Sequence, residues 1–178
     1  KGYHSAFFGK GCTPLGWFKD HGYDETDFIH KHPNGNAHGD WWEPAEKTLI
    51  PEDDPKRLFS LARNSIGYLE RRASDKKPFF LTISHYALHV RNMSLKSTRR
   101  KYLDIVAERE GLEEEIPDIS KFDDNAEEMP AKLRSHWERA NYAAMMEDMD
   151  TSIGMVLEKL KELDLEENTY VIFSSDNG

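Results

Sequence analysis

The chain has 178 residues, of which 38% are hydrophobic and 32% charged, a balance typical of one globular domain with its own core. Its formal net charge of -9 argues against general attraction to nucleic-acid phosphates, although a local cationic pocket could still bind a small anion. Cys12 is the only cysteine, which excludes an intrachain disulfide, and the chain contains no apolar run of about 18 residues that could span a membrane.

The first predicted strand is the apolar run Ala6–Phe8, which leads into a glycine. Residues 11–51 are rich in Gly, Pro, His, Asn and Trp without clear periodicity, which predicts a long irregular excursion of the kind that often carries function. A helix is expected next, because Asp54 suits an N-cap and Pro55 the first helical position, and apolar residues then recur at helical spacing.

The stretch "PFFLTISHYALH" predicts a second strand, and its continuous apolar start indicates burial on both faces, as in a parallel sheet. Residues 99–138 are polar and acidic and are interpreted as helical pieces and surface loops. The clearest helix is predicted over residues 142–165, and "YVIFSS" is predicted to be a third strand. The predicted apolar stripe of that helix consists of Met146, Met149, Ile153, Val156, Leu157, Leu160 and Leu163. Alternating strands and helices indicate an α/β fold with a mainly parallel sheet flanked by helices.

Polar side chains follow each of the three predicted strands. They are Lys10, His89 and the pair Asp176 and Asn177. In open α/β sheets, ligands bind outside the carboxyl ends of the strands. Taken singly, each has a plainer interpretation: Asp-Asn-Gly is a common tight turn, and a lysine or histidine beyond a strand is often only solvated. Together they suggest a site, because carboxylate and amide oxygens suit Ca²⁺ or Mg²⁺ while a lysine and a histidine suit an anion.

Four stretches carry a family resemblance, in the family's own order: "GYHSAFFGK", "HGYDE", "PFFLTISHYALH" and "YAAMMEDMDTSIGMVLEKLKELDLEENTYVIFSSDNG". Together they resemble the central part of a type I sulfatase of the alkaline-phosphatase-like superfamily. The resemblance implies that residues 1–178 are the central part of a single catalytic domain, truncated at both ends.

The resemblance also implies roles for individual residues. Asp176 and Asn177 would be two of four side-chain oxygen ligands to a divalent cation, most often Ca²⁺, with Mg²⁺ as the alternative. Lys10 would bind a sulfate oxygen, and His89 would contact the sulfate or the leaving oxygen of the ester. Hydrolysis moves negative charge onto that leaving oxygen, and fixed cations aimed at it lower the barrier.

The chain departs from the family pattern after Lys10, where the family's Gly-Lys is followed by Trp-His-Leu-Gly. Gly11 and Cys12 follow Lys10 here, so the histidine of that motif is absent from its usual place. The loop histidines that could substitute are His21, His30, His32 and His38, and their spacing selects none of them.

The family's nucleophile, a formylglycine made from the first residue of Cys/Ser-x-Pro-x-Arg, is expected outside this chain. Two further metal-binding aspartates are expected upstream, and a second sulfate-binding lysine downstream. The stretch "CTPLG" at Cys12 begins like the nucleophile motif, but Gly16 stands where the arginine should be and the segment follows Gly-Lys instead of preceding it. Cys12 is therefore interpreted as a loop thiol.

The sequence thus predicts an internal fragment of a sulfatase whose complete form hydrolyses sulfate esters of small molecules or glycans, and which alone has no useful activity. Two alternatives stay open: a phosphodiesterase or phosphonate hydrolase of the same superfamily, and a non-catalytic carbohydrate-binding relative. Nucleic acid is not an expected partner. The resemblance implies a periplasmic, secreted or lysosomal location.

Overall fold

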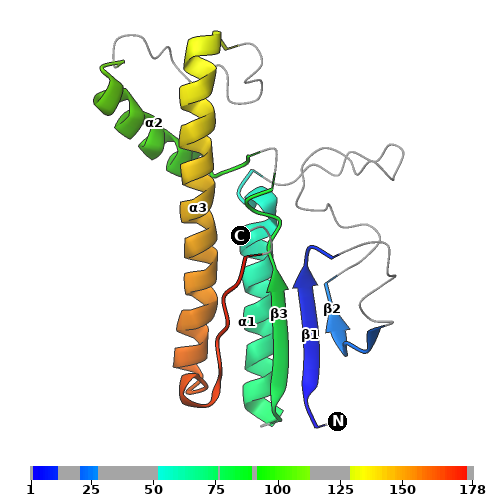
Figure 1. Ribbon diagram of the computed structural model, residues 1–178. Coiled ribbons are helices and arrows are strands. Elements are labelled where there is room, and N and C mark those ends of the chain that lie inside the picture. The colour runs from blue at the N-terminus through cyan, green and yellow to red at the C-terminus, as the bar shows by residue number, and fades with distance from the viewer. Residues whose placement is uncertain are drawn as a thin grey trace.

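The computed structural model describes six stretches of the chain: residues 2–11, 21–27, 52–75, 77–89, 92–112 and 129–175. They form a small parallel sheet with helices packed against it, so the predicted α/β class is confirmed (Figure 1). None of the helices in these stretches is long and apolar enough to cross a membrane.

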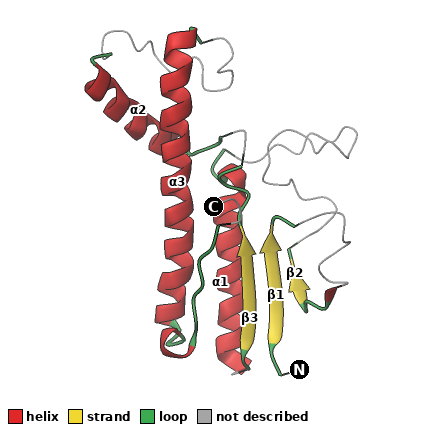
Figure 2. Cartoon of the chain, in the orientation of Figure 1, coloured by secondary structure: helices red, strands yellow, loops and turns green. Residues whose placement is uncertain are grey.

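The sheet has three strands in the order β2-β1-β3 (Figure 2). Strands β1 (His4–Gly9) and β3 (Phe79–Ser84) confirm the first two predicted strands, and they pair in parallel from His4 opposite Phe79 to Gly9 opposite Ser84. Their carboxyl ends therefore lie side by side at one edge of the sheet.

The two-residue strand β2 (Glu25–Thr26) lies within the excursion that the sequence predicted to be irregular. It pairs in parallel with β1, with Ala6 opposite Glu25. Glu25 and Thr26 are both polar, and two residues are too few to show the alternation of apolar and polar residues by which a strand is recognised in a sequence. They become a strand only because β1 provides the hydrogen-bonding partner.

Helix α1 (Leu58–Asp75) follows a short turn, η3 (Pro55–Arg57), whose Lys56 and Arg57 have positive φ values. The capping predicted for Asp54 is confirmed, since its Oδ1 accepts hydrogen bonds from Phe59 N at 2.8 Å and Ser60 N at 3.0 Å. Those amides have no partner within the helix, so the carboxylate satisfies donors that would otherwise be orphaned. The predicted first helical position is wrong, because α1 begins at Leu58 and not at Pro55.

Helix α1 and the last part of the long helix cover one face of the sheet, and the main core lies between them. The buried members of this core are Ala6, Phe8, Leu61, Ala62, Tyr68, Leu69, Tyr86, Val156 and Leu160. On the other face, the ring of Tyr23 packs edge-on against Phe7, with ring centroids 5.5 Å apart, and stacks on Phe80, with ring centroids 6.4 Å apart. Phe80 nevertheless stays 55% exposed, so the prediction that this strand is buried on both faces is wrong for the part of the chain described here.

Helix α3 (Ala131–Glu162) has 32 residues, which corresponds to a length of about 48 Å. It extends well beyond the sheet, where α2 (Lys96–Glu110) packs against its first half (Figure 1). A second, smaller core lies between these two helices and contains Leu103, Met129 and Ala140, with Tyr102, Val106 and Trp137 packed against it.

The predicted start and stripe of α3 need correction. The helix begins eleven residues before the predicted Tyr142, because its polar first third is held by α2 and not by a long apolar stripe. Met146 and Leu157, predicted to be core residues, are 47% and 42% exposed, whereas Met145 is fully buried. The buried face is shifted because α3 packs against two partners, α1 and α2, along its length.

The predicted third strand at "YVIFSS" is wrong for the described residues. After α3 the chain forms a 3-10 turn, η6 (Glu166–Asn168), and then runs to Ser175 without strand pairing (Figure 2). Apolar composition favours a strand, but a ladder partner makes one, and this segment pairs with none of the three strands of the described sheet.

Candidate active site

The candidate site is the edge of the sheet where β1 and β3 end. Lys10 directly follows β1, and its backbone N donates a hydrogen bond to Ser84 O at 2.7 Å. The chain leaving β3 passes through His85 and Tyr86 to His89, whose backbone N donates to Tyr86 O at 3.1 Å. Two of the predicted residues, Lys10 and His89, therefore lie beyond neighbouring strand ends at the same edge of the sheet.

Gly9 makes this close approach of the two strands possible. Its φ of +105° lies in the region that favours glycine, and a Cβ there would come 1.9 Å from Ser84 O. The close approach of β1 to Ser84 therefore requires a residue without a side chain at position 9.

A buried ion pair holds the end of β1. Asp27 Oδ1 accepts a hydrogen bond from Gly9 N at 2.9 Å, and Asp27 Oδ2 pairs with Arg57 Nη2 at 2.9 Å. Both side chains are buried, so the pair is largely shielded from water. Sequence reasoning missed it, because Asp27 and Arg57 are thirty positions apart and no motif connects them.

His85 is a second group that the sequence reasoning missed. It directly follows β3 and is half-buried, and burial lowers the pKa of its imidazole. Its Nδ1 is buried and makes no hydrogen bond within the described residues. The available signal was position, since His85 lies within the stretch predicted as the second strand; it is the first residue after β3, level with Lys10.

The other half of the predicted site, Asp176 and Asn177, lies outside the described residues, as do Cys12, His30, His32 and His38. His21 is described and is exposed. In the part of the chain that the structure describes, no group of three or more His, Cys, Asp or Glu side chains could hold a metal ion.

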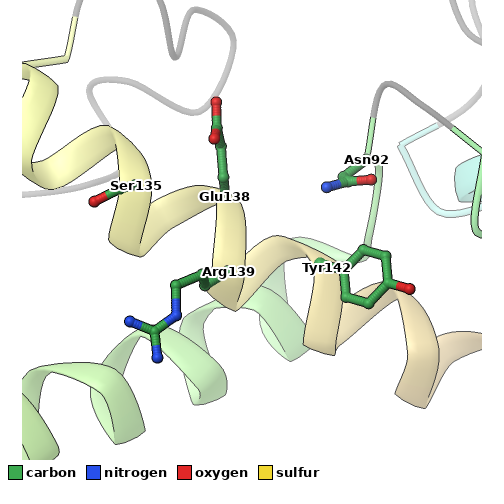
Figure 3. Close-up of a pocket in the computed structure, with 5 residues that line it drawn as sticks. All are labelled: Asn92, Ser135, Glu138, Arg139 and Tyr142. Carbon is green, nitrogen blue, oxygen red and sulfur yellow. The ribbon is translucent and has the colours of Figure 1, made fainter.

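A separate shallow groove of about 520 Å³ lies along the first part of α3 (Figure 3). It is lined by Asn92, Ser135, Glu138, Arg139 and Tyr142. Arg139 is already paired with Glu110 at 2.9 Å, and neither Lys10 nor His89 lines the groove. The strand-end site therefore remains the better candidate.

Comparison with known proteins supports a family assignment. The profile of the Sulfatase family matches residues 1–178. An ulvan-active sulfatase of Formosa agariphila is 27% identical over 194 residues, a match that covers 100% of this chain and 33% of that protein. An endo-4-O-sulfatase of Bacteroides thetaiotaomicron is 26% identical over 167 residues, with 91% and 28% covered. An N-acetylgalactosamine-6-sulfatase of Homo sapiens is 44% identical over 41 residues, with 23% and 8% covered.

The chain thus spans a third or less of the length of each of these relatives. The family match, by contrast, leaves no part of residues 1–178 uncovered. The chain belongs to the Sulfatase family.

Proposed function

We propose that the full-length protein containing this chain hydrolyses sulfate esters, with sulfated carbohydrates as the substrate class. The observation that carries the proposal is the family match over all of residues 1–178. The names of two relatives refer to ulvan and to N-acetylgalactosamine, which supports a carbohydrate substrate.

Family membership implies a divalent metal and a formylglycine nucleophile in general. Ca²⁺ is the proposed metal, with Asp176 and Asn177 as two of its ligands, because carboxylate and amide oxygens are hard donors that suit this ion. A bound divalent cation would stabilise negative charge on the sulfate group.

The proposed roles of this chain's own side chains follow from their charge and hydrogen-bonding capacity. The Lys10 ammonium binds a sulfate oxygen and offsets its charge, and the His89 imidazole hydrogen-bonds to the sulfate or to the leaving oxygen. Their positions beyond adjacent strand ends support a shared anion site.

The test is an assay of the full-length protein with an aryl sulfate and an aryl phosphate, each with and without a chelator. We expect the protein to hydrolyse the aryl sulfate. The chelator should abolish this hydrolysis, and added Ca²⁺ should restore it. Faster turnover of the phosphate ester would support a phosphoryl-transfer relative, and turnover of neither ester would contradict the proposal and favour a non-catalytic protein.

The residue-level test is Lys10→Ala, which should lower kcat/KM for the aryl sulfate by about 10²- to 10³-fold, the loss typical of removing one charge-stabilising group. Lys77→Ala is the matched control. Lys77 is exposed and lies just before the start of β3, at the opposite end of the sheet, so its removal should leave kcat/KM unchanged.

A further inference from the structure

The feature that carries a further inference is the buried carboxylate of Asp27 beneath the β1 tip. Its two oxygens have different partners: Oδ1 accepts from Gly9 N, and Oδ2 pairs with the Arg57 guanidinium, both at 2.9 Å. A buried carboxylate is costly unless it is paired and hydrogen-bonded. Both requirements are met here, and the pair joins β1, the segment after β2 and the entrance to α1.

Arg57 reaches this carboxylate from a strained backbone. Arg57 and the wholly buried Lys56 before it have φ values of +57° and +54°, in the left-handed region that side chains disfavour. Such conformations persist where the surrounding structure holds them, and they cluster at functional sites. The fold thus maintains two unfavourable backbone conformations, one at Arg57, which pairs with Asp27, and one at Lys56 immediately before it.

These contacts fix the backbone from which the Lys10 side chain extends. Asp27 holds the amide of Gly9, and Ser84 O holds the amide of Lys10 at 2.7 Å, so two successive backbone amides are anchored by groups from different elements. A lysine side chain is flexible, and only its backbone origin can be positioned by the fold. Anchoring these two amides sets that origin.

We propose that Asp27, held by Arg57, is a positioning residue that fixes the backbone of Gly9 and Lys10 at the end of β1 and thereby places the Lys10 ammonium at the anion site. This inference rests on the proposed function, since it assigns Asp27 a purpose in binding the sulfate group. Asp27 itself does not touch substrate; it acts through Lys10.

The chain offers a matched control for this idea. Asp24 Oδ2 accepts hydrogen bonds from Ser5 N at 2.8 Å and Ser5 Oγ at 2.9 Å. Asp24 therefore anchors β1 in the same manner as Asp27, from the same segment, but near the other end of the strand. If these aspartates only stabilised β1, changing either one to Asn would weaken sulfate binding equally. If Asp27 positions Lys10, only the change at Asp27 should weaken sulfate binding.

The experiment uses the full-length protein with Asp27→Asn, Arg57→Lys and Asp24→Asn, each alone and combined with Lys10→Ala. Asparagine keeps the size of Asp27 but can accept through only one atom, so either the Gly9 bond or the Arg57 bond is lost. Arg57→Lys keeps the charge and provides a milder variant should Asp27→Asn not fold. The measurements are kcat and KM for an aryl sulfate, the affinity for inorganic sulfate by calorimetry, and the melting temperature.

The expected result is a loss of about 10- to 100-fold in kcat/KM for Asp27→Asn, the effect of misplacing a binding group by roughly 1 Å. Sulfate affinity should weaken in parallel, and Asp24→Asn should change neither. In the Lys10→Ala background, Asp27→Asn should add almost nothing, because the group that it positions is gone.

Equal losses for Asp24→Asn and Asp27→Asn, or a full further loss in the Lys10→Ala background, would overturn the inference in favour of a purely structural role. A wild-type protein without turnover that still binds sulfate through Lys10 would refute the proposed hydrolysis alone, and the sulfate affinities of the variants would then decide the inference. A wild-type protein that neither turns over the ester nor binds sulfate would overturn both.

Discussion

Gly9 occupies a position in which any side chain would collide with the main chain of β3. The Cβ of an alanine would lie 1.9 Å from Ser84 O, and the φ of +105° is itself unfavourable for a residue with a side chain. The absence of a side chain at Gly9 is thus what permits the end of β1 to lie so close to Ser84.

Gly9→Ala should therefore destabilise the fold by about 3 kcal/mol or more, since steric overlap adds to backbone strain. Gly154→Ala, in the interior of α3, should instead stabilise by about 0.5–1 kcal/mol, because nothing lies within 4 Å of its Cβ position and the helix favours alanine. Urea unfolding of both variants measures the difference, and a stable Gly9→Ala protein would contradict the close approach of β1 and β3.

Ionisation of the Tyr68 hydroxyl should make the stability of the fold depend on alkaline pH. Burial raises the pKa of this phenol to about 12 from its ordinary value of 10.0. The folded state therefore favours the neutral form, so the stabilisation is complete below pH 10 and is lost as the pH rises through about 12.

Tyr68→Phe should flatten this decline between pH 10 and 12, because no proton remains to be lost. It should also cost about 1 kcal/mol at neutral pH, since the hydroxyl donates a hydrogen bond to His4 O at 2.7 Å. Unfolding free energies across that pH range test both effects; an unchanged slope would show that Tyr68 is not the titrating group.

At the scale of elements, the start of α2 depends on a side chain from α3. Leu95 occupies the N-cap position and makes no side-chain capping bond. Asp148 provides one instead: its Oδ2 accepts from Leu95 N and its Oδ1 from Thr98 Oγ1, both at 2.7 Å. A carboxylate beside the first turn of a helix also interacts favourably with the helix dipole.

Asp148→Ala should lower the free energy of unfolding by about 1–3 kcal/mol, because it leaves two partly buried donors, Leu95 N and Thr98 Oγ1, without this acceptor. Amide hydrogen exchange should rise chiefly in α2. Glu158→Ala, at an exposed position on the same helix, should stay within about 0.5 kcal/mol of the wild type. Equal effects for the two variants would show that Asp148 does not cap α2.

At the scale of the whole molecule, the described chain joins two cores through one helix. The sheet, α1 and the second half of α3 form the first core, and α2 packs on the first half of α3 to form the second (Figure 1). A parallel sheet with helices packed on it agrees with the alkaline-phosphatase-like fold of the Sulfatase family.

The stretch from Tyr170 to Phe173 is the least buried apolar segment of this arrangement. Tyr170, Val171, Ile172 and Phe173 are 97%, 61%, 87% and 76% exposed. Contiguous exposed apolar side chains of this kind attract other apolar surfaces.

The 178-residue chain should therefore enhance the fluorescence of a hydrophobic dye, and Ile172→Lys with Phe173→Lys should remove roughly half or more of that signal. Met146→Lys, which changes a single exposed apolar residue on α3, is the control and should have a small effect. Dye fluorescence that is indifferent to the double change would show that this segment is covered in solution.

Sequence reasoning recovered those features whose signal is local. The strand at Ala6–Phe8 and the apolar start of the predicted strand "PFFLTISHYALH" were recognisable as apolar runs, and Asp54-Pro55 as a helix entrance. The sequence did not predict elements that depend on a partner distant along the chain. Strand β2 forms because it pairs with β1, and the first part of α3 is stabilised by packing against α2. The predicted strand "YVIFSS" does not pair with the sheet. The roles predicted for Lys10, His89, Asp176 and Asn177 stay predictions.

The amino-acid sequence by itself determined the α/β class, the positions of β1, β3 and α1, and the family to which the chain belongs, because each depends on residue types close together along the chain. Only the tertiary structure decided that Gly9 lies against Ser84 and that Asp27 and Arg57 meet beneath Lys10. Contacts between residues distant in sequence depend on how the elements pack, and no periodicity in the chain records that packing.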